Sequence, residues 1–287
     1  MTARGNQFTS FAEDNFSRSG SSGLYDRARP TYPQPAFDTI LSLLSPSSTV
    51  VELGAGSGIF TRGFLATTLE NQEGKVKELI AVEPSEGMRE GWEKKIGQVE
   101  GLRESEIKVE IQDGLFDKIP VEDGKADLIV IAQAFHWIGS NGESAIRDMA
   151  RVLKPNGVIA LIWNLEDRTV PWVAELRDGY EKHEAGTPQA RLGLWKSIFD
   201  TTFYHETYEE AKLEQFHRNL PSNEQGVVDR ILSKSYITAL SEEEQDKVAQ
   251  EMREIVKRGE GKKWIDEKEG TFEYPYNTDL YIIRKKA

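Results

Sequence analysis

Hydrophobic and polar positions along the first part of the chain follow two rhythms. Short runs of β-branched and other apolar residues alternate with stretches in which apolar residues recur every three or four positions. The first rhythm is typical of buried strands and the second of amphipathic helices, so their alternation predicts a parallel sheet with crossover helices. The predicted strands cover residues 48–53, 78–84, 107–113, 126–135 and 157–164.

The stretch 143–153 illustrates the helical rhythm. Ile146, Met149, Ala150 and Leu153 fall on one stripe of a helix. The sequence KPNG follows, and its proline and glycine are residues that end helices. We therefore expect a helix between the fourth and fifth predicted strands.

The pattern changes after residue 164. Residues 165–211 are rich in Trp, Tyr, His and charge and contain no apolar run, which predicts a mostly helical insertion over the sheet edge. Residues 212–220 alternate weakly and predict a sixth strand. The run 271–286 predicts a seventh strand, interrupted at Pro275. Two capping-box patterns between these strands predict helix starts, at Ser222 with Gln225 and at Ser241 with Glu244.

These elements predict an α/β fold: a Rossmann-like, seven-stranded mixed sheet with helices on both faces and a helical cap insertion. The chain divides into four parts on this interpretation. They are an N-terminal helical segment (1–46), a ligand-binding core (47–164), a helical cap over the pocket (165–211) and the C-terminal part of the core (212–287).

Composition narrows the classes of partner. The chain has 287 residues, no cysteine and a net charge of -12, which excludes a disulfide scaffold and argues against DNA or RNA as the main partner. No apolar stretch is long enough for a membrane span, and the N-terminus lacks the apolar core of a signal peptide. We expect a cytoplasmic protein, a monomer or homodimer, that binds a small molecule and no nucleic acid, membrane or metal.

The first predicted strand ends in a glycine-rich loop, VVELGAGSG, at Val50 to Gly58. Three glycines at alternate positions allow a tight turn in which side chains would obstruct a ligand, and the next helix points its N-terminal NH groups at that ligand. A dinucleotide site prefers G-x-G-x-x-G, but here Ile59 follows Gly58. Glu52, two residues before Gly54, is poorly placed beside a pyrophosphate and suits a positively charged amino group. The pattern favours S-adenosylmethionine over a nicotinamide dinucleotide.

The ends of the following strands carry further candidates. Glu83 ends the second strand, where a carboxylate can accept hydrogen bonds from both ribose hydroxyls. Asp113 ends the third strand and could accept from an adenine amino group. The fourth strand ends in AQAFHW, at the edge where open α/β sheets bind ligands.

These motifs resemble the class I S-adenosylmethionine-dependent methyltransferases, in the small-molecule branch called type 11, near the trans-aconitate methyltransferase group. The resemblance covers nearly the whole chain. It rests on YDRARPTYP, VVELGAGSG, AVEPSEGM, QDG, AQAFHW, RVLKPNGVIAL, LSKSYITAL and YPYNTDLYIIRK. It is specific for a methyltransferase and says little about the substrate.

The resemblance implies a set of residues around the cofactor S-adenosylmethionine. They are Gly54, Gly56 and Gly58 at the methionine moiety, Glu83 at the ribose, Asp113 at the adenine, Gln133 beside the sulfonium, and Tyr25 and Arg29 closing over the cofactor. Trp137 and Trp163 lie near the same sheet edge and are candidates for the substrate pocket.

The function expected from these features is direct, in-line transfer of a methyl group to a small-molecule acceptor, at a carboxylate or hydroxyl oxygen. A carboxylate acceptor needs no base, whereas a hydroxyl does, and His136 is the nearest candidate base or pocket residue. Two alternatives stay open: a catalytically inactive regulator that binds S-adenosylmethionine, and a nicotinamide-dependent oxidoreductase.

Overall fold

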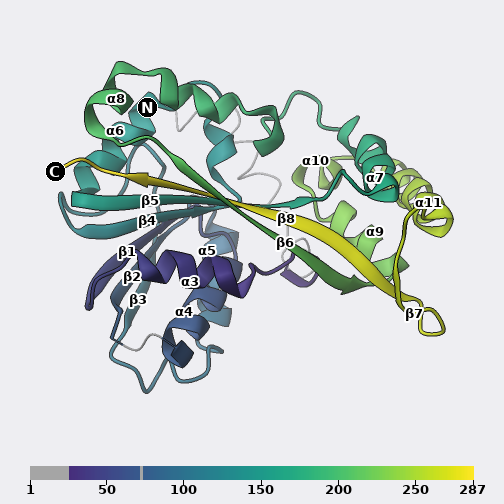
Figure 1. The fold of residues 1–287 in the computed structure, drawn as a ribbon, viewed down its shortest axis with the longest axis horizontal. Helices are drawn as coiled ribbons and strands as arrows, with labels where there is room; N and C mark the ends of the chain where they lie inside the picture. The colour runs from purple at the N-terminus through teal and green to yellow at the C-terminus, as the bar shows by residue number, and fades with distance from the viewer. Residues whose placement is uncertain (1–25, 72–73) are drawn as a thin grey trace.

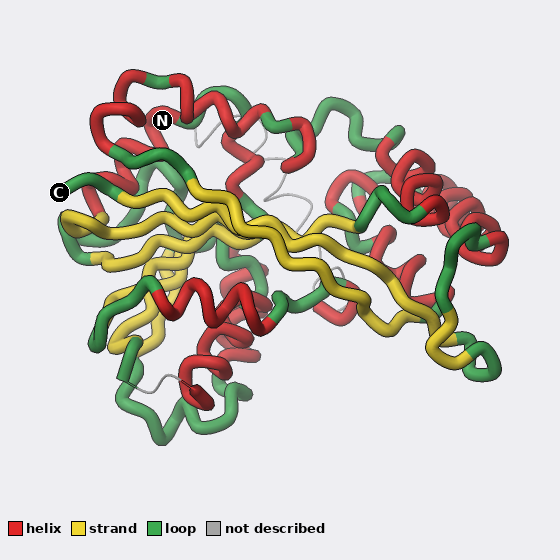
Figure 2. Tube along the Cα trace, in the orientation of Figure 1, coloured by secondary structure: helices red, strands yellow, loops and turns green. Residues whose placement is uncertain are grey.

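The computed structural model of the chain describes residues 26–71 and 74–287. Its strands form one sheet in the order β3-β2-β1-β4-β5-β8-β6, and β7 pairs with β8 at one end (Figures 1 and 2). The strands are β1 (Ser48–Leu53), β2 (Val76–Val82), β3 (Lys108–Gln112), β4 (Ala126–Ala132), β5 (Leu153–Glu166), β6 (Lys212–Ser222), β7 (Trp264–Asp266) and β8 (Thr271–Arg284).

The sheet is mixed. Neighbouring strands from β3 through β5 pair in parallel, whereas β8 runs antiparallel to both β5 and β6. The strand order reverses between β1 and β4, and this reversal opens a crevice at the carboxyl ends of the strands. The prediction of a Rossmann-like mixed sheet is confirmed.

Helices cover both faces of the sheet, and alternate residues of each strand supply the two cores. On β1, Val50 packs in one cluster with α3 (Gln34–Ser42) and α4 (Ile59–Asn71), and Val51 packs in the other with α6 (Glu143–Val152). Three further elements add to these layers. They are α5 (Glu86–Ile96) on the first face, and η3 (Leu194–Asp200) and α8 (Thr202–Thr207) on the second.

Strands β5, β6 and β8 run on beyond this body into a group of helices that we call the distal lobe (Figure 1). The lobe consists of α7 (Pro171–Glu181), α9 (Glu224–Leu232), α10 (Ser235–Thr238) and α11 (Glu242–Arg258). Its core joins Trp172 and Leu176 of α7 to Ile231 of α9, Met252 of α11 and Phe272 of β8. The lobe is thus built from chain segments that precede and follow β6 in the sequence.

The segment 165–211 divides between two places in the structure. Its first helix, α7, belongs to the distal lobe, whereas η2 (Ala190–Leu192), η3 and α8 return to the sheet body. The return is anchored at Tyr208, whose hydroxyl donates to the Ile146 carbonyl oxygen of α6 at 2.7 Å.

Two local predictions need correction. Asn223 rather than Ser222 caps α9, because its side chain accepts from the Gly226 N–H while Ser222 still pairs within β6. Strand β8 is not interrupted at Pro275. The pairing of β8 with β5 ends at the pair of Tyr276 with Glu166, and Pro275 lies one residue beyond it, so the N–H that proline lacks is not needed for a bond to β5.

The short exposed strand β7 has no predicted counterpart. The box at Ser241 and Glu244 is confirmed. Among the described residues, no helix combines the length and the apolar character that crossing a membrane requires.

Candidate active site

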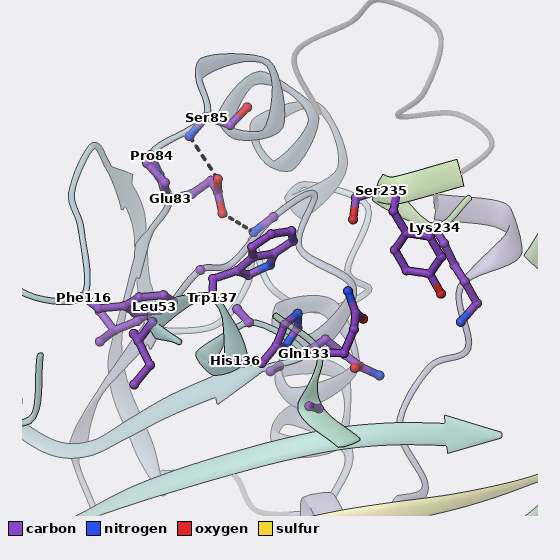
Figure 3. Close-up of a pocket in the computed structure, with 18 of the residues that line it drawn as sticks. Leu53, Glu83, Pro84, Ser85, Phe116, Gln133, His136, Trp137, Lys234 and Ser235 are labelled. Carbon is purple, nitrogen blue, oxygen red and sulfur yellow. Dashed lines mark hydrogen bonds between the residues drawn. The ribbon is translucent and has the colours of Figure 1, made fainter. Parts of the chain in front are cut away.

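A cavity of about 540 Å³ lies at the carboxyl ends of β1, β2, β4 and β5 and reaches the distal lobe. Its volume is in the range of small-molecule sites. We call its two sides the glycine end and the lobe end. The glycine end is lined by Gly54, Gly56, Glu83, Ser85 and Met88, and the lobe end by Glu166, Arg177, Tyr180, Arg230 and Lys234. Gln133, His136 and Trp137 lie between Glu83 and Lys234 (Figure 3).

The loop after β1 leaves its backbone open to the cavity at Gly56. Gly56 has φ +55°, and a Cβ at this position would meet no atom within 4 Å. Its N–H donates to Glu83 Oε2 at 2.9 Å, which ties the loop to the end of β2. A ligand can therefore approach the backbone here, as the sequence predicts.

Gly58 serves packing rather than the cavity. It has φ +83°, and a Cβ would lie 2.6 Å from Cδ1 of Trp92 on α5. Gly58 is not among the lining residues, whereas Gly54 and Gly56 are. The third glycine of the motif allows the start of α4 to lie close against α5.

Glu83 is held rigidly at the glycine end. Its Oε1 accepts from the Ser85 N–H at 3.0 Å, and its Oε2 accepts from Gly56. The residue is only 8% exposed, so the carboxylate is fixed where a ligand hydroxyl could donate to its oxygens. Asp113 lies apart, exposed and paired with Arg89 at 3.4 Å, and does not line the cavity.

Glu52 is buried beneath the loop, outside the cavity. It is 1% exposed, and its Oε2 accepts from the Thr61 hydroxyl at 2.6 Å, which in turn accepts from Trp92 Nε1. Burial raises the pKa of the Glu52 carboxyl to about 8. The structure does not bring this residue to the ligand side of the loop.

Gln133 occupies a strained backbone conformation where β4 ends. Its φ of +58° is in the left-handed region, where a side chain other than glycine costs roughly 1–3 kcal/mol. Its N–H donates to the Ile162 carbonyl, and its Nε2 donates to the Asn164 carbonyl at 3.0 Å. These two bonds to β5 hold the side chain at the middle of the cavity.

His136 is in η1 (Phe135–Ile138) and faces the cavity beside Trp137 (Figure 3). Burial, and secondarily the Arg29 guanidinium, lower the pKa of His136 to about 3. Its Nδ1 lies 3.3 Å from Trp163 Nε1. Since an indole nitrogen only donates, Nδ1 is the acceptor and the ring proton is on Nε2. His136 is therefore a neutral donor at physiological pH.

Trp163 lies under the cavity rather than in it. It is 1% exposed and packs against Trp195 in a tilted arrangement, with ring centroids 4.6 Å apart. It does not line the cavity, whereas Trp137 does. Trp163 therefore contributes to the site by donating to His136 Nδ1.

Arg29 connects the N-terminal side of the chain to the lobe. Its Nη2 donates to the Ser233 carbonyl oxygen at 2.8 Å, and it lines the cavity. Two residues further on, the Thr31 carbonyl accepts from Asn164 Nδ2 at 3.0 Å. Tyr25 lies outside the described residues.

The charged residues of the lobe end were not identified from the sequence. Glu166 ends β5, and Arg230 and Lys234 come from α9 and the turn after it. All three are at most 8% exposed and line the cavity. The sequence did contain a signal. Arg230 and Lys234 are the two charged residues of RILSKSYITAL, whose other positions are all uncharged, and cations in such a stretch are candidates for buried, paired charges.

The chain is similar to known methyltransferases. A methyltransferase-domain family model matches residues 51–161, which include the glycine loop, Glu83, Gln133 and His136. An uncharacterised methyltransferase-like protein of Schizosaccharomyces pombe is 33% identical over 239 residues, covering 81% of this chain and 83% of the relative. An uncharacterised methyltransferase of Mycobacterium bovis is 33% identical over 162 residues, covering 55% and 58%.

The fold is also similar to solved structures. A Bacillus halodurans protein assigned as a methyltransferase superposes with a TM-score of 0.53 over 88% of this chain and 99% of its own, at 16% identity. At that identity, the likeness concerns the fold alone.

Proposed function

This chain belongs to the S-adenosylmethionine-dependent methyltransferases, and we propose that it methylates an oxygen of a small-molecule acceptor, with a carboxylate preferred over a hydroxyl. The neutral His136 at the middle of the cavity carries this choice. The sequence resemblance to the trans-aconitate methyltransferase group supports it.

The glycine end fits the cofactor on its own geometry. The open Cα of Gly56 leaves room for a ligand against the backbone, and the fixed Glu83 carboxylate suits paired ribose hydroxyls. We assign Gly54, Gly56, Glu83 and Gln133 to cofactor binding. When bound, S-adenosylmethionine supplies an electrophilic methyl group on a sulfonium. The chain then has to orient the acceptor in line and exclude water.

His136 is poorly suited to remove a proton from a hydroxyl. A base whose conjugate acid has a pKa of about 3 has little driving force to take a proton from an alcohol. Its Nδ1 is also engaged by Trp163, which leaves the Nε2–H as a donor. Such a donor can orient an acceptor carboxylate, which is already ionised at neutral pH and needs no base.

The remaining parts of the site have supporting roles in this proposal. Arg29 and Thr31 tie the N-terminal segment to the lobe and to β5, which suits a cover over the cavity. Glu52 and Gly58 support the loop from below rather than touching the cofactor. Neither a nicotinamide oxidoreductase nor an inactive regulator gains support from the comparisons.

The test is transfer of tritiated methyl from S-adenosylmethionine to a panel of small acids, each paired with its amide and its alcohol. We expect label on acids, as base-labile methyl esters. Label on alcohols alone would refute a carboxylate as the acceptor. Label on neither acids nor alcohols, from a protein that binds S-adenosylhomocysteine, would refute a small-molecule oxygen acceptor. S-adenosylhomocysteine should raise the melting temperature, whereas NADH should not.

A further inference from the structure

The lobe end of the cavity concentrates positive charge in a protein whose net charge is -12. Glu166 Oε1 lies 3.1 Å from Arg230 Nη2 and 3.2 Å from Lys234 Nζ, so one carboxylate oxygen contacts two cations. Arg29 adds a further cation close enough to Lys234 to act on its charge. Arg230 and Lys234 therefore share one oxygen of Glu166.

The other carboxylates of the lobe end are already paired. Glu181 contacts Arg177 at 2.7 Å and Arg191 at 3.1 Å, and Glu184 also pairs with Arg191. Neither carboxylate is within ion-pair distance of Arg230 or Lys234 among the described residues. Glu184 acts on Lys234 only at longer range, so among the described residues Glu166 is the carboxylate in ion-pair contact with Arg230 and Lys234.

Two nitrogen atoms of the Arg230 guanidinium lack a hydrogen-bond acceptor among the described residues. Arg230 is 4% exposed, and its Nε and Nη1 have no hydrogen-bond partner of ordinary geometry within the described part of the chain, although the Tyr276 phenol lies nearby. A buried donor left unpaired is costly, and guanidinium donors match the oxygens of carboxylates and phosphates. Arg230 lines the cavity, so a bound molecule can supply the missing acceptor.

The surroundings of Lys234 also disfavour its charged form. Burial and then Arg230 lower the pKa of Lys234 to about 7, against the opposing effect of Glu166. Its Nζ lies 4.3 Å from the centre of the Tyr180 ring, which favours the charged form through a cation–π contact. An anion placed between Arg230 and Lys234 would favour it further.

We propose that Arg230 and Lys234 form an anion subsite that binds a carboxylate or phosphate group of the acceptor, separate from the oxygen that receives the methyl group. This assignment rests on the proposed function for its place in catalysis. The acceptor then carries at least two anionic groups, one held at the lobe end and one presented between His136 and the glycine end (Figure 3). The alternative is a purely structural ion cluster that joins β5 to α9.

Calorimetric titration with malonate and with inorganic phosphate tests the subsite without an identified acceptor. We expect millimolar binding of at least one anion to the wild type, weakened about tenfold or more in Arg230→Met and Lys234→Met, since each loses a charge-assisted hydrogen bond. The matched control is Lys182→Met, which removes a lobe cation paired with Glu251 outside the cavity. It should bind the anions as the wild type does.

Proton uptake adds a readout that a structural cluster would not give. The charge of Lys234 depends on Glu166 of β5, Tyr180 of α7, Glu184 after α7, Arg230 of α9 and Arg29 of the N-terminal segment. Anion binding should raise the pKa of Lys234, so at pH 8 the protein should take up a proton as malonate or phosphate binds. Titrations in two buffers of different ionisation enthalpy measure this uptake.

A crystal of the wild type soaked in malonate avoids the risk that a variant fails to fold. Density for malonate against Arg230 supports the subsite, whereas no density and no calorimetric binding of either anion overturn it. Equal anion binding in the wild type and a folded Arg230→Met variant also overturns it. Failure of S-adenosylhomocysteine to bind would instead refute the proposed function, because the anion titrations do not need the cofactor.

Discussion

The two ends of the cavity are built in different ways. The glycine end consists of backbone and strand ends: the loop after β1 and the carboxylate of Glu83 at the end of the adjacent parallel strand β2. The lobe end consists of side chains from β5, α7, α9 and the turn after α9, which meet only because the distal lobe packs against the extended end of β8. The backbone of the glycine end suits a cofactor that many related enzymes share, whereas the side chains of the lobe end suit an acceptor that differs from one enzyme to the next.

This difference predicts which changes affect which ligand. Substitutions at the glycine end should reduce cofactor affinity, whereas substitutions at His136 and at the lobe end should affect the acceptor and leave cofactor affinity nearly unchanged. Four variants test this division.

The largest effect is expected from Gly56→Val. At φ +55° a β-branched side chain is strained, and it would project into the space that the open Cα leaves for a ligand. Strain of roughly 1–3 kcal/mol and the loss of ligand space together predict a loss of cofactor affinity of about a hundredfold or more. Calorimetry with S-adenosylhomocysteine measures it.

Gly270→Val is the matched control. Gly270 has φ +69°, and a Cβ at this position would also meet no atom within 4 Å, but the residue lies in the turn between β7 and β8, away from the cavity. The variant should carry a similar conformational strain and keep the cofactor affinity. Equal losses in both variants would mean that strain alone, rather than ligand space, explains the effect.

Glu83→Ala should have the next largest effect. The change removes up to two charge-assisted hydrogen bonds to the ribose, each worth about 1.5–3 kcal/mol where well formed. It also frees the Gly56 and Ser85 N–H groups that Glu83 now binds. Affinity for S-adenosylhomocysteine should fall at least tenfold, with the far-ultraviolet spectrum unchanged. An unchanged affinity would remove Glu83 from the cofactor site.

How far the sequence predicts each end follows from the same difference. The strands were predictable because β-branched runs such as Val50–Val51 mark buried strands regardless of context, and the glycine loop because its positive φ values need glycine. The burial of Glu52 was not predictable, since the sequence does not show which face of β1 its side chain is on; it bonds to Thr61 of α4. The packing role of Gly58 was not predictable either, because it depends on Trp92 of α5.

The lobe end was harder for a physical reason. Arg177 and Arg230 lie on the apolar stripes of α7 and α9, but arginine is rarely buried, so residue type alone would place both side chains in solvent. Packing of α7 and α9 against β8 buries them. The strand β7 was missed because its three exposed residues carry no hydrophobic period. Local patterns do not encode such long-range burial.

His136→Asn should have a small effect. If the acceptor is a carboxylate, turnover should stay within about threefold of the wild type, because no proton has to be removed. The pH profile of the wild type should show no ionisation of His136 near pH 6.5, since burial holds its pKa at about 3. His217→Asn, on the exposed β6 edge, is the control. A loss above about a hundredfold with cofactor affinity preserved would make His136 the base.

Glu52→Gln should have the smallest effect on binding and a defined effect on stability. The carboxyl pKa rises from 4.5 in the unfolded chain to about 8 in the folded protein, so the folded state retains a proton that the unfolded state releases between these values. The free energy of unfolding of the wild type should therefore fall as pH rises through this window, and the glutamine, which cannot ionise, should remove that contribution. The Thr61 hydroxyl can still donate to the amide oxygen. Urea unfolding of both proteins at pH 5 and pH 8 should show the variant gaining stability relative to the wild type at the higher pH.

The affinity of Glu52→Gln for S-adenosylhomocysteine should stay within about twofold of the wild type, since the side chain lies outside the cavity. A tenfold loss would instead bring Glu52 into the cofactor site as a direct partner of the amino group.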